Sequence, residues 1–300
     1  MQYNKRDAAI VSFINMKGGV GKTTLCKEMG NYLSLRYKNK NDEDLKVLLI
    51  DIDPQANLTQ ALNERYRPDY KEYEQKVSIE NIFNTKTTGY DIDRIIVKLH
   101  KNLDLIPGEL ETIFLERAQN NNTSHKLMDF IEDNKLKEKY DFIFIDCPPT
   151  YSVYTEMAFF CGDYYFIPVI PDAYSALGVD LLERVVADII YNNRNSIFKD
   201  RKSKNIGVIF TRVDLSNKPQ QQHFIDALSE IKIIKENNIN IFNSQFTESN
   251  KLSTSQFEKM LTDREDKKLD NMIDNICSEF LDRVEVLKDE VVNKENQINR

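Results

Sequence analysis

The sequence lacks several features that mark common classes of protein. No apolar stretch approaches the roughly 18 residues of a membrane-spanning helix. The cysteines are scattered and include no Cys-x-x-Cys pair, so disulfide staples and a zinc knuckle are not expected, and a reducing cytoplasm is the simpler interpretation. The formal net charge of −7 excludes a diffuse attraction to DNA or anionic lipid, so any such contact needs a local basic patch.

Internal repeats and domain linkers are also missing. The polar residues 1–7 run straight into an apolar strand and are not expected to be a signal peptide. With 300 residues, of which 41% are hydrophobic, the chain can build a sizeable core. We therefore predict a single domain over residues 1–300.

A phosphate-binding loop is predicted near the N-terminus. The apolar run 8–14 is typical of a buried strand, and residues 25–37 have helical spacing, with NMKGGVGKTT at 15–24 between them. Glycines in such a loop let successive N–H groups point at one anion, and the helix N-terminus adds partial positive charge. By the general P-loop pattern, we expect Lys22 to bind the β- and γ-phosphates and the Thr23 hydroxyl to bind magnesium.

Carboxylates follow two further apolar runs. Asp51 and Asp53 come after residues 47–50, and Asp146 comes after residues 142–145. The carboxyl ends of strands in an open α/β sheet face the ligand crevice. Asp146 is therefore expected to be a Walker B carboxylate that holds magnesium through water.

Strand and helix patterns alternate along the rest of the chain. This alternation predicts an α/β fold with a mostly parallel, twisted sheet flanked by helices on both faces. Residues 256 onward have apolar side chains at three- and four-residue spacing, and we expect a helical C-terminal extension over 261–300. Other expected strands are 103–106, 164–169, 206–210 and 239–242; expected helices are 78–83, 109–119, 124–138, 176–192 and 219–236; a surface excursion is expected at 63–76.

The phosphate loop departs from the general pattern, because Met16 stands where the first glycine belongs. The segment KGGVGKTT at 17–24 resembles the deviant Walker A box of the ParA/MinD ATPases, and is closest to that of the ParA/Soj partitioning ATPases. The resemblance extends over residues 8–260, including DIDPQ at 51–55 and DCPP at 146–149. The segment TRVD at 211–214 matches the base-side segment of the family, with threonine in place of the usual asparagine.

The resemblance implies further roles. Lys17 would reach across a nucleotide-sandwich dimer to the phosphates of the partner, as an arginine finger does in trans, although it could also be a solvated loop lysine. Asp53 would polarise the attacking water, and Asp51 would support the magnesium shell or merely cap the next turn. The predicted catalytic residues are Lys17, Lys22 and Asp53; the nucleotide-binding residues are Lys17, Gly18, Gly19, Val20, Gly21, Lys22, Thr23 and Thr24; the metal residues are Thr23, Asp51 and Asp146.

A DNA-binding surface is also predicted. Members of the family that bind membranes end in a basic amphipathic helix, whereas residues 270–299 are acid-rich, so no stable membrane anchor is expected. Non-specific DNA binding needs clustered lysines and arginines, and each basic run could equally be a solvated face. The candidates are Lys251, Lys259 and Arg264, with Lys267, Lys268 and a second run at 194–204. The sequence begins at the first strand, without the helix-turn-helix of longer partitioning ATPases, so operator binding is not expected.

Taken with the resemblance, these features predict an ATP-dependent dimerising switch that segregates plasmid or chromosomal DNA. ATP and Mg²⁺ would be its cofactors, and a homodimer would bind non-specific DNA. A centromere-bound adaptor protein would stimulate slow ATP hydrolysis, and the protein would be cytoplasmic and nucleoid-associated. Two alternatives remain open: the same kind of ATPase positioning a protein or membrane cargo, and a metabolic P-loop kinase or ligase.

Overall fold

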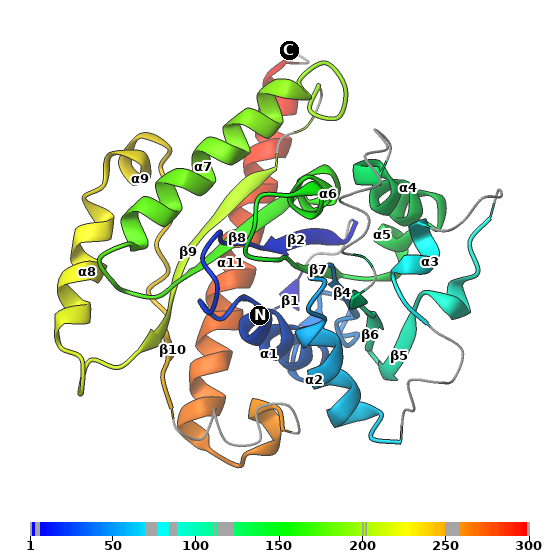
Figure 1. Cartoon of the computed structure of the whole chain (residues 1–300), viewed down its shortest axis with the longest axis horizontal. Helices are drawn as coiled ribbons and strands as arrows, with labels where there is room; N and C mark the ends of the chain where they lie inside the picture. The colour runs from blue at the N-terminus through cyan, green and yellow to red at the C-terminus, as the bar shows by residue number, and fades with distance from the viewer. Residues whose placement is uncertain are drawn as a thin grey trace.

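A central β-sheet organises the computed structural model, which describes residues 2–3, 7–69, 77–83, 89–110, 112, 123–199, 201, 203–249 and 259–298. The strands of this sheet are β2 (Ala9–Phe13), β4 (Val47–Asp51), β5 (Val97–His100), β6 (Leu103–Ile106), β7 (Phe142–Asp146), β8 (Tyr164–Val169), β9 (Lys204–Val213) and β10 (Phe246–Thr247). They lie in the order β10-β9-β8-β2-β7-β4-β6-β5 (Figure 1). Only the β5–β6 pair among them is antiparallel. The predicted mostly parallel sheet is therefore confirmed.

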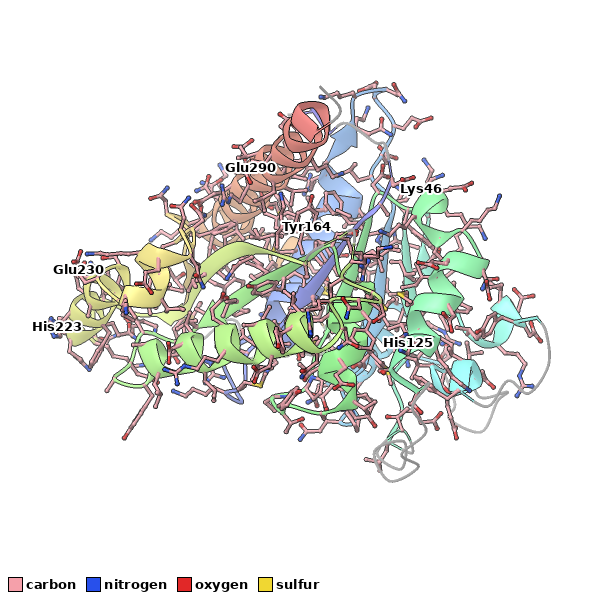
Figure 2. All side chains as sticks on the ribbon, turned by 90° about the horizontal axis from the view of Figure 1, so that it is seen from above. Lys46, His125, Tyr164, His223, Glu230 and Glu290 are labelled. Carbon is pink, nitrogen blue, oxygen red and sulfur yellow. The ribbon has the colours of Figure 1, made fainter. Side chains whose placement is uncertain are left out.

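Helices cover both faces of the sheet, as predicted. One face packs against α1 (Lys22–Arg36), α2 (Asn57–Tyr66) and α11 (Lys267–Ile298). The other packs against α3 (Glu80–Phe83), α4 (Lys126–Asp133), α5 (Leu136–Lys139), α6 (Val153–Cys161), α7 (Ser175–Asn192), α8 (Gln220–Ser229) and α9 (Lys232–Glu236). Figure 2 shows the two layers: α11, which carries Glu290, and α7 lie on opposite sides of the strand that carries Tyr164.

The central strands are buried on both faces. Every residue of β2, β4, β7 and β8 is buried, which is the expected environment of continuous apolar runs in a parallel sheet. Their register aligns the strand ends, because Asp146 is the cross-strand partner of Phe13 on one side and of Asp51 on the other. The residues that follow these strands therefore meet at one edge of the sheet.

Helix α11 belongs to the core of the sheet face that it shares with α1. The ring of Phe280 lies 5.6 Å from those of Phe142 and Phe144 and 6.0 Å from that of Phe166, measured between centroids. Apolar residues at helical spacing continue this contact along the helix: Leu269, Ile273, Ile276, Leu281, Val284 and Leu287. The C-terminal segment is thus helical as predicted, although the helix begins at Lys267 and not at residue 261, and it covers the sheet instead of standing apart from it.

Several predicted elements differ from the structure. The helix predicted over 124–138 is interrupted at Lys135, whose φ of 51° is left-handed, while the Asn134 side chain donates to the Phe130 carbonyl at 2.8 Å and competes with the helical backbone. The helix predicted over 219–236 is divided into α8 and α9, because Ile231 is extended (φ −68°, ψ 138°).

Other differences lie toward the sheet edges. The strand predicted at 239–242 forms only an isolated bridge between Ile241 and Val208. The edge strand β5 was not predicted, because its side chains are mostly part-exposed and lack an apolar run. The surface excursion predicted at 63–76 is wrong over its first residues, which are the last turn of α2, and residues 70–76 lie outside the described residues. Most of the helix predicted at 109–119 also lies outside them.

Two short features complete the described chain. A small parallel pair joins β1 (Gln2–Tyr3) to β3 (Lys38–Asn39). Single 3₁₀ turns occur at η1 (Ile92–Arg94), η3 (Thr123–His125) and η4 (Leu261–Asp263). No helix in the described ranges combines the length and the apolar character that crossing a bilayer requires.

The packing of α11 predicts a large effect of truncating its central aromatic residue. Replacing Phe280 by alanine should lower the free energy of unfolding by about 3–5 kcal/mol, because it leaves a cavity against three phenylalanine rings. Val286→Ala on the same helix is the matched control, since that side chain is 48% exposed, and should change stability by less than about 0.5 kcal/mol. Urea unfolding followed by circular dichroism measures both; equal losses would show that α11 is peripheral.

Candidate functional site

The loop between β2 and α1 has the backbone of an anion cradle. Gly19 and Gly21 adopt φ values of 73° and 86°, a left-handed conformation that other residues take only with strain. Gly21 also offers no side chain to cap α1, so the N–H groups of the first helical turn are left for a ligand. Gly18 and Gly19 are exposed, Val20 is buried, and Thr23 and Thr24 are half-buried in the first turn of α1.

Two buried polar side chains fasten this loop to the neighbouring strands. Asn15 donates through Nδ2 to the Pro168 carbonyl at 2.8 Å and accepts the Lys17 N–H at 2.9 Å. On the other side, the Thr211 hydroxyl donates to the Val20 carbonyl at 2.6 Å. Sequence reasoning missed both anchors: Asn15 was only part of the motif, and Thr211 was considered for base contacts. Their positions at strand ends were the one available signal.

Lys22 lies inside the cradle. Its side chain donates to the carbonyls of Asn15 at 3.2 Å and Lys17 at 3.4 Å, and the residue is only 6% exposed. Burial lowers the pKa of Lys22, and the nearby carboxyls of Asp146 and Asp53 oppose that shift. A buried ammonium held by loop carbonyls is suited to a polyphosphate, which would supply the negative charge that the carbonyls supply only in part.

The carboxyl group of Asp146 is buried at the end of β7. Neither of its oxygens has a hydrogen-bond partner, and the residue is fully buried. Burial raises the pKa of Asp146 well above its ordinary value and Asp51 adds to the shift, while Thr23 and Lys22 oppose it. An unpartnered buried carboxylate beside a hydroxyl fits a magnesium site, because the ion would compensate the desolvated charge. Thr23 and Asp146 are the residues that would hold Mg²⁺, which in nucleotide sites takes one or two carboxylates together with phosphates and water.

Asp51, unlike Asp146, accepts hydrogen bonds through both of its carboxylate oxygens. Its Oδ2 accepts the N–H and the hydroxyl of Thr59 at 2.9 and 2.7 Å, and its Oδ1 accepts the Asp53 N–H at 3.2 Å. Burial raises the pKa of Asp51 to about 7, against the hydrogen bonds from Thr59. This geometry agrees with the capping alternative, since Asp51 fixes the first turn of α2 to the end of β4. Its support of the magnesium shell stays a prediction.

Asp53 and the loop after β7 both lie next to the phosphate loop. Asp53 is buried, and its Oδ1 accepts the Gln55 N–H at 2.9 Å, which shapes the turn into α2. A Cβ placed on Gly18 would lie 3.9 Å from the Pro149 ring, so the Asp-Cys-Pro-Pro loop touches the phosphate loop. The structure thus brings both the DIDPQ segment at 51–55 and the DCPP segment at 146–149 to the cradle, while the role of Asp53 toward water remains a prediction.

Lys17 occupies a different environment from Lys22. Its ammonium pairs with the carboxylate of Asp172, which follows β8, and lies 6.0 Å from the Tyr174 ring centroid. The Lys17 side chain is 41% exposed. Sequence reasoning did not identify Asp172, because nothing local to the loop signals a partner so distant in the chain.

Comparison with known proteins decides the family. A family model described as an AAA domain matches residues 8–199. The virulence plasmid ParA family protein pGP5-D of Chlamydia muridarum is 31% identical over 214 residues, which cover 68% of this chain and 73% of that protein. The chain belongs to the ParA/MinD-type P-loop ATPases.

Two further similarities agree with this assignment. The chromosome partitioning protein ParA of Caulobacter vibrioides is 28% identical over 225 residues, which cover 71% of this chain and 73% of that protein. The crystal structure of a Borrelia burgdorferi plasmid partition protein bound to AMPPNP has a TM-score of 0.70 and 23% identity, covering 93% of this chain and 100% of that one. The latter similarity shows that the fold is shared.

The basic residues predicted to bind DNA are only partly gathered in this ParA-type chain. Lys259 is exposed, and Arg264 donates to its carbonyl at 3.5 Å, so both flank the turn η4. Lys251 lies outside the described residues. In the second basic run, Lys204 donates to the Leu287 carbonyl at 3.0 Å and Arg201 contacts the Phe160 carbonyl, so both hold the fold together.

The unpartnered Asp146 carboxyl predicts a magnesium requirement. Asp146→Asn should weaken Mg²⁺ binding in the presence of ADP by about 10–100-fold, the range for groups that act on a metal through an intermediate shell. Without nucleotide, the variant should melt no lower than the wild type, because the amide has no charged form for burial to disfavour. Melting temperatures at graded Mg²⁺ with ADP measure this. Asp104→Asn is the control, since that carboxyl accepts from Tyr140 instead; a wild-type magnesium response in Asp146→Asn would contradict the assignment.

The Thr211 anchor predicts a loss of nucleotide affinity when its hydroxyl is removed. Thr211→Val should cost about 1–3 kcal/mol in ADP binding, because the Val20 carbonyl in the phosphate loop loses its buried donor. Thr211→Ser retains the hydroxyl and should bind ADP within a few-fold of the wild type. Isothermal titration with ADP distinguishes the two variants, and equal affinities would show that the anchor is unimportant.

Proposed function

We propose that this ParA-type ATPase is an ATP-dependent dimerising switch that segregates DNA, of a plasmid or a chromosome. One observation carries the proposal: the phosphate loop holds two lysines in opposite environments. Lys22 is enclosed by loop carbonyls and faces the buried carboxyls, whereas Lys17 is part-exposed at the edge of the loop on Asp172. A second subunit that approaches this edge can receive Lys17 without disturbing Lys22.

In the proposed cycle, the loop N–H groups and Lys22 bind the phosphates of ATP, and Thr23 and Asp146 hold the accompanying Mg²⁺. Bound magnesium would neutralise phosphate charge. Asp53 orients the attacking water from the turn before α2. Lys17 leaves Asp172 and contributes its positive charge to the phosphates of the partner subunit, which makes ATP part of the dimer interface.

The DNA surface is proposed to include Lys259 and Arg264, together with Lys251. With a formal net charge of −7, the chain needs such a local patch to bind DNA phosphates. Dimerisation would place two patches on one particle and raise the avidity of binding. We further propose one ATPase domain over residues 1–300, a nucleoid-associated cytoplasmic location, and slow hydrolysis that a centromere-bound adaptor stimulates.

The lysine pair predicts separable defects in solution. Lys17→Ala should bind ATP but remain monomeric in size-exclusion chromatography with ATP and Mg²⁺, because its charge is needed only across the interface. Lys22→Ala should lose ATP binding itself. Lys137→Ala is the matched control, since Lys137 is a part-exposed lysine paired with Asp163 at 2.9 Å, and it should dimerise as the wild type does. ATP-dependent dimers of Lys17→Ala would refute the mechanism.

The DNA surface predicts a change in salt dependence. The double variant Lys259→Ala/Arg264→Ala should bind duplex DNA more weakly in the presence of ATP. The slope of log affinity against log salt should become shallower by about one for each DNA phosphate that the variant no longer neutralises. Lys232→Ala, an exposed lysine on α9, is the control and should leave the slope unchanged. If the wild type shows no ATP-dependent DNA binding at low salt, the cargo is not DNA, and the protein-cargo alternative is favoured.

A further inference from the structure

The turn that carries the proposed DNA residues is fastened to α2 by a forked ion pair. Arg65, in the last turn of α2, donates from Nε and Nη2 to the two carboxylate oxygens of Asp263 at 2.6 and 2.8 Å. Asp263 also accepts the Met260 N–H at 2.8 Å, which closes the turn on itself. Burial would raise the pKa of Asp263, but the hydrogen bonds from Arg65 and Met260 hold it below its ordinary value. The pair is therefore charged at neutral pH.

The same turn is tied to α1, the helix that follows the phosphate loop. Buried Glu28 accepts the Leu261 N–H at 2.8 Å, and Asn31 donates to the Thr262 hydroxyl at 3.1 Å. Asn31 in turn accepts the hydroxyl of Tyr66 from the end of α2. Residues 259–264 thus rest on two helices that both begin at the nucleotide site.

The two helices differ in how they meet that site. Helix α1 is packed against the sheet along its buried face. Helix α2 packs into the same core through Leu58 and Leu62, and it is also bonded to the Asp51–Asp53 loop, because the Asp51 carboxylate accepts from Thr59 in its first turn. Its ten residues form a rod of about 15 Å that ends at Arg65 and Tyr66. The loop at one end of the rod is therefore joined through α2 to Arg65 at the other end.

We propose that the Arg65–Asp263 pair couples the nucleotide site to the turn 259–264, so that Arg65 acts as a positioning residue for Lys259 and Arg264. A planar fork on a carboxylate fixes orientation as well as distance, which a single contact would not do. ATP or ADP at the loop sets the position of α2, and the fork passes that position to the turn. This inference rests on the proposed function only where the readout is DNA binding.

Hydrogen exchange tests the coupling without DNA. The amides of Met260 and Leu261 are both hydrogen-bonded in this turn. Replacing ADP by ATP should change their exchange by about 5–150-fold in the wild type, the usual range of coupling between sites, and by less than about twofold in Arg65→Ala. Arg65→Lys keeps the charge but loses the fork; Asp263→Asn removes the carboxylate. Both should behave as Arg65→Ala does, and they decide the question if that variant does not fold.

Two controls separate coupling from general loosening. Arg184→Ala breaks an ion pair within α7, where Arg184 and Asp180 lie 2.6 Å apart, and should retain the wild-type response. Thr262→Val removes the hydroxyl that accepts from Asn31, so it loosens the tie to α1 and leaves the contact between Asn31 and Tyr66 in place; it should raise exchange with both nucleotides while keeping their ratio. The inference is overturned if the wild type shows no nucleotide-dependent exchange in this turn, or if Arg65→Ala keeps it.

DNA binding supplies the second readout. In Arg65→Ala, the ratio of DNA affinities with ATP and with ADP should fall toward one, while ATP affinity stays within a few-fold of the wild type. If Lys259→Ala/Arg264→Ala binds DNA normally, the proposed DNA surface is wrong, but the exchange result still decides the coupling. If exchange responds to nucleotide through Arg65 in a protein that never binds DNA, the coupling stands and the cargo changes.

Discussion

The balance of buried charge at one edge of the sheet is the constraint on which the rest of the structure depends. Parallel pairing of β2, β7 and β4 brings Asp51 and Asp146 to neighbouring strand ends, close to Lys22 at the start of α1, and burial disfavours the charged form of all three. The charge of each group is compensated differently. Lys22 is held by carbonyls, Asp51 by Thr59, and the charge of Asp146 is favoured only by Thr23 and Lys22 nearby. The fold therefore holds this site together, but the buried negative charge of Asp146 would be better compensated by a cation.

The rigid phosphate loop keeps its two lysines, Lys22 and Lys17, on different sides. The glycines at 19 and 21 give the backbone its left-handed turns, while Asn15 and Thr211 attach the loop to β8 and β9. A rigid cradle needs little free energy for reorganisation when an anion binds. The same rigidity keeps Lys17 at the exposed edge of the loop, paired with Asp172, where a second molecule can approach it.

Local pattern was enough to predict the parts of the site that are contiguous in sequence. The strand–loop–helix unit and the carboxylates after β4 and β7 follow from apolar runs that end in polar residues, and the structure places them together. Asp172, Thr211 and the Arg65–Asp263 pair could not be predicted in this way, because their partners lie up to 198 residues away and each is an ordinary surface or strand-end residue by itself. The interrupted helices after 124 and 219 were missed because apolar spacing continues through both breaks.

The place of α11 has a consequence for the order in which the protein can be made. The sheet face that holds Phe142, Phe144 and Phe166 receives its cover from residues 269–287, close to the end of the chain. While the chain leaves the ribosome, these aromatic rings remain without their partner until α11 has been synthesised. Long-range pairing of this kind slows folding and exposes apolar surface to other chains. A chain that lacks α11 would therefore expose the aromatic rings of this sheet face.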